Sequence, residues 1–191
     1  MHLKADSLPL DAEIRRFRPS FGLRSPFVQS VLSSSRLRCR REHPMERHAK
    51  ALVIETAQGV RLQGFFSRPE GDFNGMLLLL HGWGGSAEST YIRTTGRYLF
   101  DCGYGVFRLN MRDHGDTHHL NPGLFYATLL EELVDAAGQV AGLAGGEPFF
   151  IAGFSLGGNF ALRIARALRR RPIANLAHVV AVSPVLNPSS A

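Results

Sequence analysis

The sequence predicts an α/β protein whose sheet is mainly parallel, with helices on both faces. Strand and helix patterns alternate from about residue 50 onward, which is typical of parallel strands joined by helices. Residues 76–80 form a continuous apolar run, as expected of a strand that is covered on both sides. Before the alternation, residues 51–56 and 60–66 flank the turn Gln58-Gly59 and predict an antiparallel hairpin.

The remaining elements follow from periodicity and from helix-ending residues. Further strands are expected over residues 105–111, 148–154 and 178–184. Apolar residues at helical spacing predict a helix between Glu88 and Asp101. Asn121-Pro122, a suitable cap and first-turn pair, predicts the start of a second helix, and residues 156–171 predict a third, stopped by Pro172.

Composition favours one globular domain. Of the 191 residues, 45% are apolar, enough for a core, which we assign to residues 51–191. Residues 1–50 hold 11 basic and 5 acidic side chains, whereas the rest holds 11 of each, so we expect a basic N-terminal extension flanking the core. The run 36–41 could bind nucleic acid or anionic lipid, but it lacks interleaved aromatic residues, and a solvated arm needs less explanation.

The sequence indicates neither a membrane-spanning segment nor a disulfide framework. No apolar stretch approaches the roughly 20 residues that span a bilayer, and the first 25 residues lack the apolar core of a secretory signal. Cys39 and Cys102 are therefore expected to be reduced thiols, and the protein is expected to be cytoplasmic.

The segment Gly153-Phe154-Ser155-Leu156-Gly157 fits the pattern Gly-x-Ser-x-Gly between a predicted strand and a predicted helix. A serine in such a sharp turn points its hydroxyl outward, and glycines two positions before and after let strand and helix approach closely. Ser155 is thus a candidate nucleophile. The alternative interpretation is an ordinary glycine-rich turn that cradles phosphate at the helix N-terminus.

A second glycine-rich motif follows the apolar strand at residues 76–80. Its residues His81-Gly82-Trp83-Gly84-Gly85-Ser86 are typical of a loop that stabilises an oxyanion. The backbone N–H groups of Trp83 and Leu156 are the expected donors. We expect His81 to hold the turn by hydrogen bonds rather than to act as a base. The residues expected to shape the site are His81, Gly82, Gly84, Gly153 and Gly157.

Together with residues 110–115 (Asn-Met-Arg-Asp-His-Gly), these two motifs make the chain resemble the α/β-hydrolase superfamily, and most closely its YheT-like branch. The segment 25–31 is similar to that branch more loosely. The resemblance implies hydrolysis of a small-molecule carboxylic ester by a serine, a histidine and an acid, without a cofactor.

The chain departs from the family pattern toward its end. The resemblance places the acid after the seventh strand, or the sixth in some members, and the histidine after the eighth, whereas six strands are predicted here. Asn187 falls near the alternative acid position and cannot carry a negative charge, and no histidine follows His178, which we expect to be structural.

These departures lead to three expectations. We expect the chain to be C-terminally truncated and nearly inactive alone, and the strand near residues 178–186 to form an exposed edge that favours association. A non-catalytic binding protein with the hydrolase fold is the alternative interpretation.

The loop after the strand at 105–111 is rich in polar side chains. Asp113, His114, Asp116, His118 and His119 include metal-binding residue types, but their spacing is not diagnostic. We expect no metal, and a loop that lines the mouth of the site, with Arg112 and Asp113 bracing each other. His114 as a substitute base is a further, less favoured interpretation.

Overall fold

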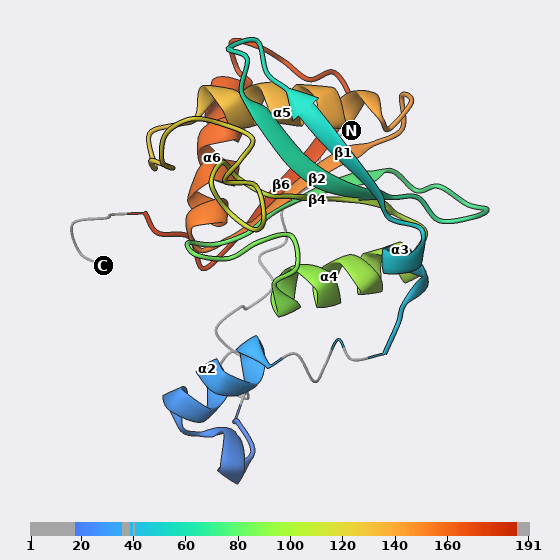
Figure 1. Ribbon diagram of the computed structural model, residues 1–191. Coiled ribbons are helices and arrows are strands. Elements are labelled where there is room, and N and C mark those ends of the chain that lie inside the picture. The colour runs from blue at the N-terminus through green and yellow to red at the C-terminus, as the bar shows by residue number, and fades with distance from the viewer. Residues whose placement is uncertain (1–17, 36–38, 40, 187–191) are drawn as a thin grey trace, which may run out of the picture. The chain divides into compact units, whose positions relative to one another are not determined.

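The computed structural model describes residues 18–35, 39 and 41–186 (Figure 1). Its contacts divide the chain into two units, Met1–Ser35 and Arg36–Ala191. In the first unit, the short 3-10 helix η1 (Phe21–Leu23) precedes α2 (Pro26–Ser34), which has proline in its first turn. The basic extension expected over residues 1–50 stays a prediction.

The second unit is built on one six-stranded sheet. Its strands, in the spatial order β1-β2-β4-β3-β5-β6, are β1 (Lys50–Glu55), β2 (Arg61–Ser67), β4 (Gly105–Leu109), β3 (Met76–Leu80), β5 (Phe149–Phe154) and β6 (Leu176–Val182). β1 and β2 pair antiparallel, as does β2 with β4, and the other neighbours are parallel. The predicted hairpin and the mainly parallel sheet are thereby confirmed.

Helices cover both faces of this sheet (Figure 1). α3 (Pro44–Arg47) and α4 (Thr90–Asp101) pack with the side chains of Leu77 and Leu79. α5 (Glu131–Gly142) and α6 (Leu156–Ala167) pack with those of Leu78 and Leu80. Because successive side chains of a strand point to opposite faces, the apolar run of β3 supplies both cores.

The helix expected to begin at Asn121-Pro122 is wrong at its start, because α5 begins only at Glu131. The Asn121 amide does not cap a helix. It accepts a hydrogen bond from the Arg61 N–H at 2.8 Å and donates one to the Arg61 carbonyl at 2.7 Å. The Asn121 side chain thus pairs with the backbone of β2 as a neighbouring strand would, and it holds this segment in a long loop. The third predicted helix is also shorter than expected, since α6 ends at Ala167.

Two smaller features bear on the remaining expectations. Cys39 is buried and Cys102 is exposed, and neither is in a disulfide. Within residues 18–35, 39 and 41–186, none of the helices has the length and apolar character needed to cross a bilayer.

Candidate active site

The two glycine-rich motifs meet at the carboxyl ends of β3 and β5. These strands are parallel neighbours, with Leu80 in register with Gly153. β3 lies between β4 and β5, so the chain changes direction across the sheet at this point. In open α/β sheets, ligands bind in the crevice beyond the carboxyl ends of the strands at such a switch. The topology therefore places both motifs where a site is expected.

Ser155 joins β5 to α6 through a left-handed backbone conformation, with φ 52° and ψ −115°. A residue with a side chain adopts this region at a cost, so the surrounding structure must hold it there. Its N–H donates to the Val182 carbonyl at 2.9 Å, which ties the turn to the end of β6. The exposed side chain of Ser155 makes no capping hydrogen bond to α6.

Glycines let the strand, the helix and the loop approach closely around this serine. A Cβ atom at Gly153 would overlap the Gly157 backbone, and one at Gly157 would overlap the carbonyls of Leu80 and His81. A Cβ atom at Gly82 would lie 3.3 Å from the Ser155 Cβ. The loop after β3 and the turn after β5 therefore touch at Gly82 and Ser155.

Two backbone N–H groups beside the serine are unused. Across the part of the chain that the structure describes, neither the N–H of Trp83 nor that of Leu156 has an acceptor. Gly84 has φ 64°, which turns the loop back just after Trp83. The Trp83 side chain is 73% exposed, and its ring meets that of Phe125 edge-on at 6.0 Å.

His81 is buried, and both nitrogens of its ring are engaged. Nε2 accepts from the Met111 N–H at 3.1 Å, so Nδ1 carries the proton and donates to the Gly82 carbonyl at 2.8 Å. Burial lowers the pKa of His81 to about 4; electrostatic interaction with the neighbouring His114 also lowers this pKa, and the bond to Gly82 opposes the shift. This imidazole links β3, the glycine loop and the loop after β4, and it has no free nitrogen with which to accept a proton.

Three side chains that the sequence analysis did not single out hold the same loop. The Tyr91 hydroxyl accepts from the Gly82 N–H at 2.9 Å. The Asn110 side chain accepts from the Ala87 N–H at 2.7 Å, and the buried Arg108 donates to the Ala87 carbonyl at 3.0 Å. Asn110 opens the motif at residues 110–115, which is a sequence signal for its role, whereas Tyr91 lies in the predicted helix between Glu88 and Asp101 and carries no such signal.

Comparison with known proteins places this architecture in a family. A family model described as the alpha/beta hydrolase fold matches residues 75–191. The chain belongs to the α/β-hydrolase family. The esterase homologue slr0264 of Synechocystis sp. is 34% identical over 113 residues, which are 58% of this chain and 31% of the relative.

Solved structures agree with this assignment. XC6422 from Xanthomonas campestris, described as a serine hydrolase without a lid, is 25% identical, with a TM-score of 0.54 over 64% of this chain and 57% of that one. Esterase Est22 is 20% identical and shares the fold, with a TM-score of 0.65 over 86% of this chain and 54% of that one. The chain thus spans about a third of the length of slr0264 and just over half of each of these structures.

The loop after β4 is braced differently from the expected pattern. Arg112 does not pair with Asp113; it binds the buried Glu132 at 2.7 and 3.0 Å, whereas Asp113 pairs with His118. Burial raises the pKa of Glu132, and the hydrogen bond from Arg112 opposes that rise. The expected pairing is wrong because Glu132, from the first turn of α5, offers a buried carboxylate to Arg112.

His114 and the neighbouring polar residues do not form a metal cluster. Among the described residues, no three His, Cys, Asp or Glu side chains converge on one point. His114 Nδ1 lies 2.8 Å from the Arg112 carbonyl, and its ring contacts those of His81 at 4.9 Å and Phe125 at 4.8 Å. Phe125, which the sequence analysis missed, thus joins this loop to Trp83 at the site.

His178 lies away from the serine. It is exposed on β6, in register with Phe150, and stacks on that ring at 6.2 Å. Phe150 precedes Phe154 by four residues, or about 13 Å of strand. The structure thus does not bring His178 to Ser155. Asn187, considered at the alternative acid position, lies outside the described residues.

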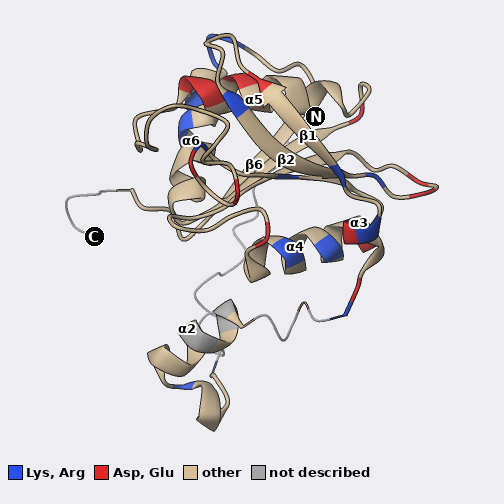
Figure 2. Ribbon diagram, in the orientation of Figure 1, with Lys and Arg blue, Asp and Glu red and all other residues tan. Residues whose placement is uncertain are grey.

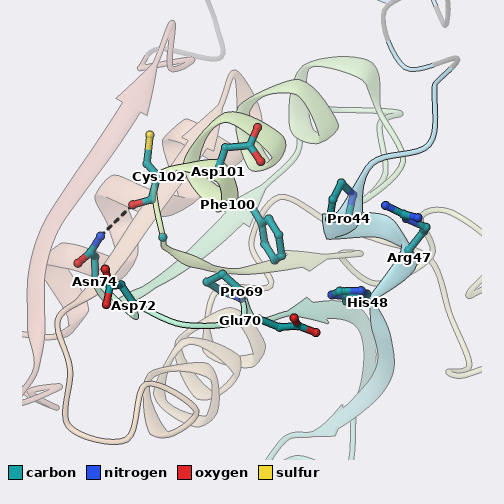
Figure 3. Close-up of a pocket in the computed structure, with 11 residues that line it drawn as sticks. Pro44, Arg47, His48, Pro69, Glu70, Asp72, Asn74, Phe100, Asp101 and Cys102 are labelled. Atoms are coloured by element: carbon teal, nitrogen blue, oxygen red, sulfur yellow. Dashed lines mark hydrogen bonds between the residues drawn. The ribbon is translucent and has the colours of Figure 1, made fainter.

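A cavity of about 640 Å³ lies at the opposite end of the strands from Ser155 (Figure 3). Its wall includes Phe100, Gly103 and Asn74, which surround the amino ends of β3 and β4. The charged residues that line it are of both signs: Arg47, Glu70, Asp72 and Asp101. This mixture favours no single class of ligand, and none of the residues from the two glycine-rich motifs lines the cavity.

Proposed function

We propose that this chain carries the nucleophile and the oxyanion loop of a serine hydrolase that acts on carboxylic esters, with Ser155 as the nucleophile. The observation that carries the proposal is the left-handed turn at Ser155, φ 52°. This turn places the Ser155 side chain, whose hydroxyl does not cap α6, beside the Gly82 loop. Strained backbone of this kind persists where function requires it. The family assignment and the esterase among the relatives support the same chemistry.

In the proposed reaction, the Ser155 oxygen attacks the ester carbonyl carbon, and a base takes the hydroxyl proton. The N–H groups of Trp83 and Leu156 hold the oxygen that becomes negative, and each such donor is typically worth about 3 kcal/mol. Collapse of the intermediate expels the alcohol, which receives the proton. Water then attacks the acyl-serine and gives a proton to the base, which returns it to the Ser155 oxygen as the bond to the acyl group breaks. The acid product leaves, and the cycle needs no cofactor.

Among the described residues, neither His81 nor His178 is placed to act as this base, and we therefore expect slow turnover from the chain alone. Both nitrogens of His81 are engaged, and His178 lies on β6 beside Phe150. Serine hydrolases that lack a triad member keep only about 10³ to 10⁴-fold acceleration over water, which comes from binding and the oxyanion hole.

Turnover of p-nitrophenyl butyrate tests this proposal. We expect slow hydrolysis that Ser155→Ala abolishes and that Ser25→Ala, in the first unit, leaves unchanged. Equal rates in wild type and Ser155→Ala would exclude Ser155 as the nucleophile. Rates typical of a complete triad would instead show that a base exists within residues 1–191.

A non-catalytic binding protein is the second candidate, favoured by the engagement of His81 and by the exposed Trp83 at the mouth of the site. A fluorophosphonate probe labels only an activated serine, so labelling at Ser155 supports the hydrolase. Trp83 is the single tryptophan of the chain. Quenching of its fluorescence by ester analogues, with neither labelling nor hydrolysis that depends on Ser155, would favour the binding protein.

Three finer assignments are part of the proposal. The motifs at residues 81–86, 110–115 and 153–159 favour the YheT-like branch of the family. A cytoplasmic location and the lack of a nucleic-acid partner rest on the composition of the sequence.

A further inference from the structure

A cleft of about 630 Å³ between α5 and α6 is lined by five arginines and a single carboxylate, that of Glu131. The arginines are Arg163, Arg166, Arg169, Arg170 and Arg171. Figure 2 shows the basic residues of α6 beside the acidic start of α5. This concentration of one charge contrasts with residues 51–191 as a whole, where basic and acidic side chains are equal in number.

Among the described residues, the carboxylates of α5 form ion pairs with only one of these arginines. Arg171 binds Glu131 at 3.2 Å and Asp135 at 2.6 Å. Asp135 also accepts a hydrogen bond from the Ala57 N–H at 3.1 Å, so both of its oxygens are used. Both ion pairs made by α5 at the cleft are therefore with Arg171.

The other four arginines have no ion-pair partner among the described residues. Arg163 donates to the Ala127 carbonyl at 2.6 Å, which holds its guanidinium in place without a negative partner. Arg166, Arg169 and Arg170 make no ion pair or side-chain hydrogen bond to any described residue. Cations near a helix C-terminus stabilise it, which accounts in part for Arg166 but not for Arg163, a turn earlier, because the effect fades within the last turn.

Shape and chemistry together indicate the occupant. A cleft of this volume lies within the range of small-molecule sites, and Leu130, Val134 and Ala167 give it an apolar floor. Arginine binds phosphate oxygens through a planar pair of N–H donors. We infer that the cleft between α5 and α6 binds a soluble ligand that carries two or more phosphoryl groups. A concave wall suits such a ligand better than the flat surface of a membrane.

Isothermal titration calorimetry with tripolyphosphate, at physiological ionic strength, tests the inference. We expect saturable binding with one ligand per chain, and weaker binding of orthophosphate, because fewer arginines are engaged at once. The double variant Arg166→Gln with Arg170→Gln should weaken tripolyphosphate binding at least about tenfold, since each lost charged hydrogen bond removes roughly that factor. Both side chains are exposed, so unchanged circular dichroism should accompany the loss.

A control with the same loss of charge separates a site from general attraction. Arg47→Gln with Arg68→Gln removes two exposed arginines away from the cleft and should change the affinity less than about twofold, because salt screens distant charges. Equal weakening by both double variants would overturn the inference. So would the absence of saturable binding, or binding to phosphatidylglycerol vesicles without binding to tripolyphosphate. None of these readouts depends on ester hydrolysis, so they stand apart from the test of Ser155.

Discussion

At the scale of single residues, His81 couples the candidate site to the stability of the fold. Its imidazole is buried at the end of β3 and bonds the Gly82 carbonyl and the Met111 N–H. The folded protein holds its pKa at about 4, chiefly through burial, whereas an unfolded chain has the ordinary value of about 6.5. The folded state therefore resists protonation of this ring, and the unfolded state accepts it.

We predict that acid destabilises the protein through His81. As pH falls from about 6.5 to about 4, the unfolded state gains a proton that the folded state does not, so the free energy of unfolding falls by about 3 kcal/mol. Urea unfolding at about pH 7 and pH 4 measures this loss. His81→Gln should lower stability at neutral pH and flatten the dependence on pH. The matched control is His178→Gln on exposed β6; if it flattens the dependence as much as His81→Gln does, the assignment to His81 is wrong.

For single residues, the predicted backbone conformation was found where the signal was local in sequence. Ser155 stands in a five-residue pattern, and the structure places it in the sharp turn that the pattern implies. Tyr91 and Phe125 were missed because their contacts with Gly82 and Trp83 depend on how distant segments meet. The pairing of Arg112 with Asp113 was wrong for the same reason, since the preferred carboxylate, Glu132, lies 20 residues away.

At the scale of elements, the packing of α6 on the sheet depends on the absence of a side chain at Gly157. Its Cα faces the carbonyls of Leu80 and His81 at the end of β3. Backbone atoms at such a contact cannot rotate away as a side chain can. An added methyl group must therefore displace the helix, the strand end or both, together with the turn at Ser155.

We predict that Gly157→Ala lowers the free energy of unfolding by about 1–3 kcal/mol, the usual cost of overpacking a close contact. Gly138→Ala is the matched control on α5, where a Cβ atom would meet nothing within 4 Å. That change should stabilise the protein by about 0.5–1 kcal/mol, because alanine favours the helix. Chemical denaturation of both variants measures the two effects, and stabilisation by both would show that α6 tolerates the added methyl.

Elements were predicted well where apolar periodicity was strong. They were predicted poorly where a residue that can cap a helix can also make a tertiary hydrogen bond. The run 76–80 was predicted as a strand and is β3. Asn121-Pro122 has the local character of a helix start, yet the Asn121 amide pairs with the Arg61 backbone on β2. A choice between a cap and a tertiary hydrogen bond depends on a partner 60 residues away, which local sequence cannot specify.

At the scale of the whole sheet, the two edge strands differ in their protection. β1 begins with Lys50 and ends with Glu55, whereas β6 contains no Lys, Arg, Asp or Glu. In the described part of the chain, β6 pairs with β5 alone, and Val180 on it is 52% exposed. Charged residues on an edge oppose pairing with another chain, and an apolar, β-branched edge invites it.

We therefore predict that residues 1–191 self-associate through β6 as concentration rises. Val180→Lys should suppress this association, because pairing would bring two lysines close together or bury their charge. Val53→Lys is the matched control, since Val53 is similarly exposed, at 54%, on the charged edge strand β1. Light scattering coupled to size-exclusion chromatography over a dilution series measures the mass of each variant. Association that persists in Val180→Lys but disappears in Val53→Lys would place the contact on β1, where Lys50 and Glu55 of two antiparallel copies could pair.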